Sequence, residues 1–128
     1  MSTTPNEYVK GSYASDVFLL EGSLAQEVYA GHRDDILSLE DGDDFARGGG
    51  GSDIMVASSG DNTFYGGAGH DILMGGDGNN ILYGEKGNDD LYDFYGGDVL
   101  DGGEGDDIYH IVGGKSDSGT DFFRVIIP

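Results

Sequence analysis

Acidic and apolar positions recur together with a period of nine residues from Ala30 to His110. One slot of every repeat holds an aspartate or asparagine, and an apolar residue follows two places later. The acidic slot contains Asp35, Asp44, Asp53, Asn62, Asp71, Asn80, Asp89, Asp98 and Asp107. The apolar slot contains Leu37, Ala46, Met55, Phe64, Leu73, Leu82, Leu91, Leu100 and Tyr109. A period kept over this length without an insertion or deletion indicates a repeat protein.

Each repeat divides into a turn and a short strand. The first half is rich in glycine and ends with the acidic residue, which suits a tight turn or a backbone with positive φ. The second half suits a strand, with the apolar side chain in the middle pointing to one face. Two repeats then make one coil, and stacked coils pair their strands in parallel. We therefore predict an all-β fold, a parallel β-roll with the apolar slot between its two sheets.

In such a roll, alternate repeats share an edge. The first edge carries Asp35, Asp53, Asp71, Asp89 and Asp107, and the second carries Asp44, Asn62, Asn80 and Asp98. Neighbouring coils are roughly 4.8 Å apart, and carboxylates at that spacing repel one another. Simple β-turns also use aspartate and glycine, but they do not need aspartate at nine-residue intervals. The stacks therefore predict a hard cation with oxygen ligands, for which Ca²⁺ is well suited.

The motif G-G-x-G-x-D-x-U-x, in which U is apolar, stands almost unchanged at 48–56, 66–74 and 102–110. It has one or two changes at 75–83 and 84–92. This motif resembles the hemolysin-type RTX nonapeptide repeat, which forms a calcium-binding β-roll. The resemblance implies a right-handed solenoid with several calcium ions, each held between two turns of one edge by aspartates and by carbonyl groups of the glycine-rich segments.

The candidate calcium ligands implied by this resemblance are Asp35, Gly49, Gly51, Asp53, Gly67, Gly69, Asp71, Gly76, Gly78, Asn80, Gly87, Asp89, Asp98, Gly103, Gly105 and Asp107. We expect tight sites between the acidic slots 53 and 71, 71 and 89, and 89 and 107, and a weaker site between 35 and 53. The second edge is interrupted by Asn62 and Asn80, which bring no charge. We therefore expect its sites to be partial or empty.

The resemblance also implies a function and a location. Members of the family are secreted, typically by type I export without an N-terminal signal, and they fold when they meet external calcium. We therefore expect a non-catalytic calcium-binding module that supports folding and secretion of an extracellular protein. The alternative is an adhesion or carbohydrate-binding module attached to a secreted polysaccharide-active enzyme.

Composition agrees with a cation-dependent fold. Of the 128 residues, 25 are acidic, 6 are basic and 25 are glycine, which gives a formal charge of −19. In an ordinary domain this composition suggests disorder. Because of the repeat, we expect the chain to be disordered only until cations bind. Nucleic acid is excluded as a partner because it requires basic surfaces. The chain has no cysteine, no signal-peptide core in residues 1–10 and no apolar run that approaches a membrane span.

The ends of the chain depart from the motif. We expect residues 1–11 to be a flexible lead and 12–29 to be a calcium-free capping coil, with Val17 to Leu20 as a strand. Counting back by nine places Leu19 and Val28 in the apolar phase. Residues 30–110 form the roll. Residues 111–128 are expected to cap its far end, with Phe122, Phe123, Val125 and Ile127 over the last coil, although this tail also resembles a type I export signal.

The residues beside the apolar slot should point outwards. One outer face has Ile36, Ile54, Val56, Ile72, Met74, Tyr92 and Ile108. The other has Phe45, Arg47, Thr63, Tyr65, Ile81, Tyr83, Val99 and Asp101. Apolar faces of this extent often meet a neighbouring domain, a second copy or the terminal segments, although β-branched residues are also simply good strand formers. The exposed tyrosines Tyr65, Tyr83 and Tyr92 suggest polysaccharide as another partner.

Nothing in the sequence indicates catalysis. The histidines His32, His70 and His110 stand at different slots of different repeats. None has a serine, cysteine or second histidine at a spacing that suggests a nucleophilic relay or a zinc site. The many carboxylates are assigned to cation binding, and no pattern predicts a pocket around them. We therefore expect surface histidines without a catalytic role.

Overall fold

The computed structural model describes residues 6–111 and 124–126, and within them it contains strands and turns but no helix. The part of the chain so described accordingly has no helix of the length and hydrophobicity needed to cross a membrane. The strands are β1 (Asn6–Lys10), β2 (Val17–Leu20), β3 (Ala25–Gly31), β4 (Ile36–Leu39), β5 (Phe45–Gly49), β6 (Ile54–Ala57), β7 (Thr63–Ala68), β8 (Ile72–Met74), β9 (Ile81–Lys86), β10 (Asp90–Asp93), β11 (Val99–Asp101), β12 (Ile108–Ile111) and β13 (Arg124–Ile126).

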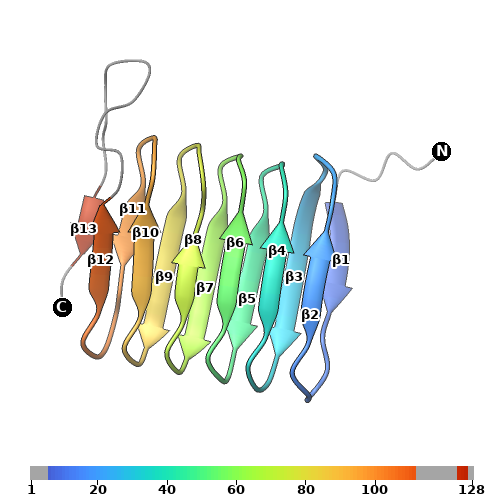
Figure 1. Cartoon of the computed structure of the whole chain (residues 1–128), viewed down its shortest axis with the longest axis horizontal. Helices are drawn as coiled ribbons and strands as arrows, with labels where there is room; N and C mark the ends of the chain where they lie inside the picture. The colour runs from blue at the N-terminus through green and yellow to red at the C-terminus, as the bar shows by residue number, and fades with distance from the viewer. Residues whose placement is uncertain (1–5, 112–123, 127–128) are drawn as a thin grey trace.

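Successive strands alternate between two parallel sheets. Sheet A has the order β1-β3-β5-β7-β9-β11-β13, and sheet B has the order β12-β10-β8-β6-β4-β2. The two sheets lie face to face, and the coils follow one another along the long axis of the molecule (Figure 1). The prediction of a two-sheet parallel β-roll is confirmed.

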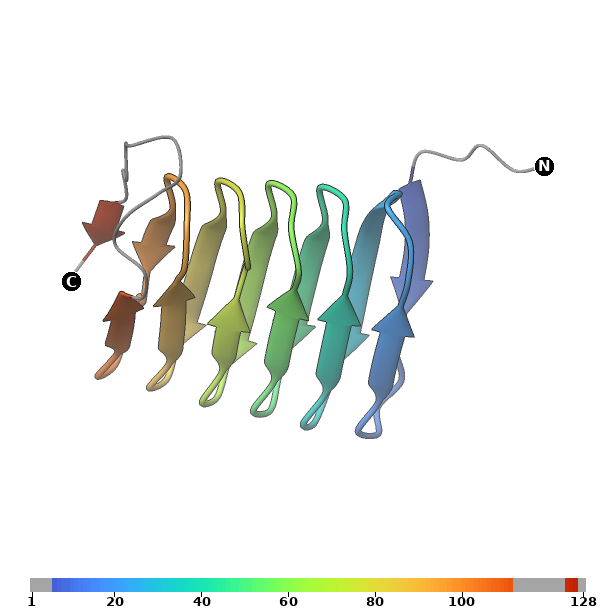
Figure 2. The same ribbon diagram turned by 45° about the horizontal axis from the view of Figure 1, so that its top comes forward.

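The register of the sheets keeps equivalent slots in line. In sheet B, Leu37 pairs with Met55 and Met55 with Leu73, and in sheet A Phe64 pairs with Leu82. Each of these pairs joins positions two repeats apart. The turns consequently line up in two rows, one along each edge of the roll (Figure 2).

The core is a single narrow stack of side chains between the sheets. Each apolar slot from Leu37 to Leu100 is fully buried, and Leu39 and Ala57, at the first slot of their repeats, extend the stack towards the second edge. Burial alternates along each strand, as period-two geometry requires. Because the acidic slot lies two residues before the apolar slot, its side chain also points inwards, at the end of the core.

The first coil corrects two expectations. Residues Asn6–Lys10 are not a flexible lead, because they form β1 and pair with β3. Leu19 is not in the apolar phase, because its side chain is 70% exposed, whereas Phe18 pairs with Leu37 and packs against the core. The core positions Phe18 in β2 and Val28 in β3 are ten residues apart, whereas their partners Leu37 and Ala46 are nine apart, so counting back by nine fails at this point.

The expected C-terminal cap at 111–128 lies mostly outside the described residues. Within it, Arg124–Ile126 form β13, which pairs with β11 and adds one strand to sheet A. Val125 stands opposite Leu100 in this pairing. The end of the chain therefore extends the roll by parallel pairing.

Candidate metal centre

The aspartates of the first edge form a continuous ladder. The backbone N–H of each donates a hydrogen bond to the side-chain Oδ1 of the aspartate one coil further on. The N···Oδ1 distances are 2.8 Å from Asp35 to Asp53, from Asp53 to Asp71 and from Asp71 to Asp89, and 2.9 Å from Asp89 to Asp107. The prediction that these aspartates lie along one edge is therefore confirmed. The hydrogen bonds hold each side chain in a fixed orientation.

The other oxygen of each carboxylate has no such partner. Oδ2 of every first-edge aspartate from Asp35 to Asp107 is buried, and it accepts no hydrogen bond from the residues that the structure describes. Asp53 and Asp71 are completely buried. A buried oxygen without a donor is costly, and more so when it is charged. The first edge thus presents a row of oxygen atoms that need a positive partner.

A backbone carbonyl lies beside three of these oxygens, those of Asp53, Asp71 and Asp89. An ideal Cβ built on Gly66 would be 2.5 Å from Asp71 Oδ2 and 2.9 Å from the carbonyl oxygen of Gly84 in the next coil. The same arrangement recurs at Gly48, beside Asp53, and at Gly84, beside Asp89. Glycine is required here because a side chain would displace the carboxylate. A carboxylate oxygen without a donor and a carbonyl oxygen close to the same point fit an oxygen-coordinated cation.

A second glycine position lets the turns approach each other. Gly69 has φ of 115°, and a side chain there would collide with the backbone of Gly51 in the preceding coil. All glycines of the candidate ligand set share a positive φ: Gly49, Gly51, Gly67, Gly69, Gly76, Gly78, Gly87, Gly103 and Gly105. Gly49 and Gly67 lie at the ends of β5 and β7, and the others lie in the turns. Calcium binding by their carbonyls stays a prediction.

Burial makes the carboxyl groups of Asp53, Asp71 and Asp89 weaker acids than an exposed aspartate. Burial, together with the negative charges of neighbouring aspartates, raises the pKa of Asp71 to about 8 and the pKa values of Asp53 and Asp89 to about 7. The hydrogen bond from the preceding backbone N–H works in the opposite direction and does not compensate. A proton and a metal ion therefore compete for the same oxygens.

The second edge has the same ladder with mixed side chains. Backbone N–H groups donate to Oδ1 of Asp44, Asn62, Asn80 and Asp98 at 2.7 to 3.0 Å. Oδ2 of Asp44 and Asp98 is buried, with no hydrogen-bond partner in the described part of the chain. Burial raises the pKa of Asp44 to about 6, and burial together with the neighbouring carboxyl group of Asp93 raises the pKa of Asp98 to about 8.

Sequence reasoning missed three residues of these edges. Asp16 heads the first ladder, because its N–H donates to Asp35 Oδ1 at 2.7 Å. Gln26 heads the second ladder, and Asp93 is buried beside Asp98 at a slot that is glycine in many other repeats. Gly11 precedes Asp16 by the spacing that separates Gly48 from Asp53. This glycine-to-aspartate spacing could have identified Asp16 from the sequence. Asp16 was missed because it lies one residue away from the position that nine-residue counting gives.

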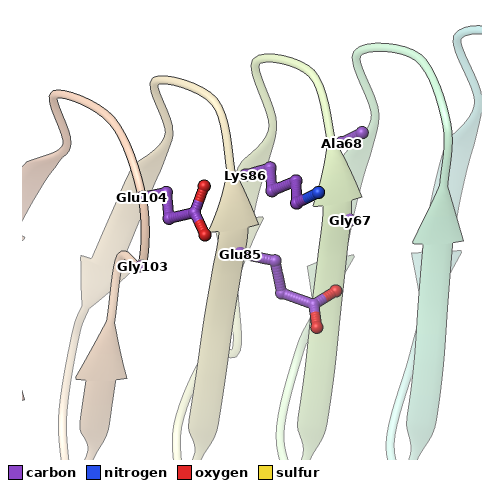
Figure 3. A pocket seen from close by; sticks show the side chains of 6 residues that line it. All are labelled: Gly67, Ala68, Glu85, Lys86, Gly103 and Glu104. Carbon is purple, nitrogen blue, oxygen red and sulfur yellow. The ribbon is translucent and has the colours of Figure 1, made fainter.

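An open depression of about 450 Å³ lies beside the first edge, where β7 and β9 end. It is lined by Gly67, Ala68, Glu85, Lys86, Gly103 and Glu104. Figure 3 shows Glu85 and Lys86 reaching towards the coil of Gly67, with Glu104 pointing towards β9. Glu85 has φ of 76° at a slot that is glycine elsewhere on this edge, and its charge adds to the causes that raise the pKa of Asp71. The depression therefore continues the acidic edge.

The histidines bind carboxylates or rings on the surface. His70 Nε2 lies 2.8 Å from Asp90 Oδ2, and His110 Nε2 lies 3.2 Å from Asp90 Oδ1, so Asp90 links three successive coils. Although burial raises the pKa of Asp90, the hydrogen bonds from both histidines bring it below its ordinary value. His32 stacks on Tyr13 with ring centroids 4.7 Å apart.

Side chains alone do not complete a metal site. Among the described residues, no group of three or more His, Cys, Asp or Glu side chains is arranged to hold a metal ion. A cation between the turns must therefore take some of its ligands from backbone carbonyls. Calcium accepts carbonyl oxygens readily, whereas structural zinc is held by four side chains, mostly cysteine and histidine. The donor set fits calcium.

The outer faces contain the expected residues. On sheet B, Ile36, Ile54 and Ile108 are 43%, 36% and 56% exposed. On sheet A, Tyr65 and Tyr83 are stacked on each other with centroids 4.7 Å apart, and the Arg47 guanidinium lies 4.4 Å from the Tyr65 centroid. The ring faces that would stack on sugars are thus partly covered by protein. Contact with polysaccharide, a second copy or a neighbouring domain stays a prediction.

Comparison with known proteins identifies the repeat. The family model described as the RTX calcium-binding nonapeptide repeat matches the chain in four copies, at residues 29–64, 65–92 and 95–110. The matched ranges cover more than half of the chain and include every acidic slot from Asp35 to Asp107. No curated protein and no solved structure matches the chain.

Proposed function

Since this chain belongs to the RTX calcium-binding nonapeptide-repeat family, we propose that it is a non-catalytic module that folds when calcium binds between the turns of its first edge. The observation that supports this proposal is the row of buried Oδ2 atoms without a donor in the described residues, three of which, those of Asp53, Asp71 and Asp89, lie beside a backbone carbonyl. The module is structural, since its carboxylates are committed to holding successive coils together.

Each candidate calcium position combines a side-chain carboxylate with a backbone carbonyl. Between turns 48–53 and 66–71, Asp53 Oδ2 and the Gly66 carbonyl would hold the ion; the next position uses Asp71 and Gly84. The position after that uses Asp89 and the Gly102 carbonyl. A bound calcium ion supplies two positive charges and accepts oxygen ligands in flexible geometry. The aspartate ladder holds the carboxylates in place, and glycine lets the carbonyl approach them.

Folding should depend on the ion for two reasons. The core between the sheets is only one stack of side chains wide, and the chain carries a formal charge of −19. A small core gives little stability to offset chain entropy, and closely stacked carboxylates oppose folding. Ligand that binds only the folded chain shifts the equilibrium towards it.

Such a module supports secretion by separating export from folding. A chain that stays unfolded where free calcium is scarce can be exported as an extended polymer. Outside the cell, calcium in the range that extracellular modules use, about 10⁻⁴ to 10⁻³ M, would fold it. We therefore assign the module to a secreted, extracellular protein exported by a type I route.

The test is a far-UV circular dichroism titration with calcium. We expect a change from coil to β-structure that a chelator reverses, and little response to Mg²⁺, which prefers a smaller octahedral cage and gives up water reluctantly. The double variant Asp53→Asn plus Asp71→Asn should require more calcium. Asp34→Asn plus Asp106→Asn is the matched control, since these two carboxylates are exposed on the same edge. No spectral change with calcium, or equal midpoints for the two variants, would contradict the proposal.

A further inference from the structure

The side-chain amides of Asn62 and Asn80 on the second edge donate hydrogen bonds to backbone carbonyls of the turns beside them. Nδ2 of Asn62 lies 3.0 Å from the carbonyl oxygen of Gly75 in the next coil, and 3.4 Å from those of Ser59 and Gly60. Nδ2 of Asn80 lies 3.1 Å from the carbonyl oxygen of Gly76. An amide NH₂ group has two donors. These turn carbonyls therefore have positively polarised partners within the protein.

The ladder fixes the orientation of both amides. Oδ1 of Asn62 accepts the N–H of Asp44 at 2.8 Å, and Oδ1 of Asn80 accepts the N–H of Asn62 at 2.9 Å. Exchanging oxygen and nitrogen in either amide would set donor against donor and acceptor against acceptor. The hydrogen-bond network thus determines which atom faces the carbonyls.

The amide nitrogen occupies the place of the partnerless carboxylate oxygen. An ideal Cβ on Gly75 would be 2.6 Å from Asn80 Nδ2, and the corresponding Cβ on Gly66 would be 2.5 Å from Asp71 Oδ2. One position in the turn therefore holds a donor on the second edge and an acceptor on the first. In the first turn, Oδ2 of Asp16 does have a donor, because the Ser12 N–H donates to it at 2.7 Å.

We propose that the side-chain amides of Asn62 and Asn80 take the place of calcium at their turns, so that calcium binding is concentrated on the first edge. This inference rests on the proposed calcium function of the first edge and adds which turns do not use it. The middle of the second edge is then held together by the protein's own donors at any calcium concentration. The roll is a solenoid with one ion-dependent edge and one partly ion-independent edge.

The decisive variant is Asn80→Asp, with Asn79→Asp as its matched control. The two residues are neighbours, and the substitutions add the same charge. Asn80 is fully buried in the turn, whereas Asn79 is exposed and accepts the Gly97 N–H at 2.7 Å. Calorimetric titration should show that Asn80→Asp binds one more calcium ion than the wild type, and that Asn79→Asp binds the same number as the wild type.

Stability in chelator gives a second readout. In EGTA the chain is expected to be a coil, and a stabilising osmolyte can restore folding there. Asn80→Asp should need more osmolyte to fold than Asn79→Asp, because it places a carboxylate oxygen beside the turn carbonyls, and calcium should remove that difference. Asp71→Asn is the converse change, which should lose one ion and need less osmolyte than the wild type.

The ion count separates this inference from the proposed function. If Asn80→Asp gains no ion relative to Asn79→Asp, the amide does not stand in for calcium and the inference is overturned. If the wild type binds no calcium, the proposed function falls. An ion gained by Asn80→Asp alone would still support the replacement.

Discussion

The backbone N–H of Asp53 donates a 2.8 Å hydrogen bond to Oδ1 of Asp71, one coil further along the roll. Oδ2 of the same carboxylate is buried beside the Gly84 carbonyl. One oxygen therefore joins two coils directly, and the other lies at the candidate cation position. Substitutions can separate these two roles.

Asp71→Ala should be less stable than Asp71→Asn at saturating calcium. Asparagine keeps an acceptor for the Asp53 N–H, whereas alanine leaves that buried donor without a partner, which costs about 1 to 3 kcal/mol. Urea unfolding of both variants in calcium measures the difference. Equal unfolding midpoints would show that the ladder hydrogen bond contributes little.

The calcium-free roll should lose stability as the pH rises. The pKa values of Asp53 and Asp89, about 7, and of Asp71, about 8, lie above the ordinary 3.8 of an unfolded chain. The folded state therefore binds more protons over this interval, so stability in chelator is greatest below about pH 4 and falls through about pH 7 to 8. Circular dichroism in EGTA across this range measures it, since β-structure should be lost as the pH rises.

Calcium affinity should change in the opposite direction with pH. The ligands must be ionised to bind the ion, so the calcium midpoint should fall as the pH rises through the same carboxyl pKa values. Calcium titrations followed by circular dichroism at about pH 6 and about pH 8 test this sign. A midpoint that does not move would mean that these carboxyls do not bind the ion.

Phe18 and Leu19 should respond differently to truncation. Phe18 packs against the core, so Phe18→Ala should destabilise the calcium-loaded roll by about 1 to 3 kcal/mol. Leu19 is 70% exposed, so Leu19→Ala should change stability by less than about 0.5 kcal/mol. Thermal unfolding of the two variants measures this. The reverse order would restore the nine-residue phase that the structure contradicts.

Glu85→Gly should stabilise the chain in chelator and weaken calcium binding. Glu85 has φ of 76°, and a left-handed conformation costs an L-residue about 1 to 2 kcal/mol, which glycine avoids apart from its larger unfolded-state entropy. Glycine also removes a negative charge near Asp71. Osmolyte-induced folding in EGTA and a calcium titration measure the two effects, and Glu104→Gln controls for the loss of a nearby charge.

The regular part of the fold could be predicted from the sequence because its period is strict. Leu37, Met55 and Leu73 stand in one buried row, as nine-residue counting requires. The grouping of Asp53, Asp71 and Asp89 on one edge follows from the same count. These positions depend only on backbone geometry, which every repeat shares.

The features that could not be predicted from the sequence are those that depend on a single residue. One extra residue between β2 and β3 moved Phe18 inwards, moved Leu19 outwards and concealed Asp16. The amide contacts of Asn62 also need atomic positions, because a missing charge predicts a weak ion site but does not show which donor replaces the ion. Pairing of Asn6–Lys10 with β3 was missed because those residues carry no motif.

Each rung of the regular ladders reaches only the coil beside it, at a separation of eighteen residues. The number of coils can therefore change without disturbing the rest of the roll. Duplicating residues 66–83 would insert one whole coil, and the coils on either side could form the same ladder hydrogen bonds with it. A coil added in this way would carry one further candidate calcium position on the first edge, at the copy of Asp71, and a further amide on the second edge, at the copy of Asn80.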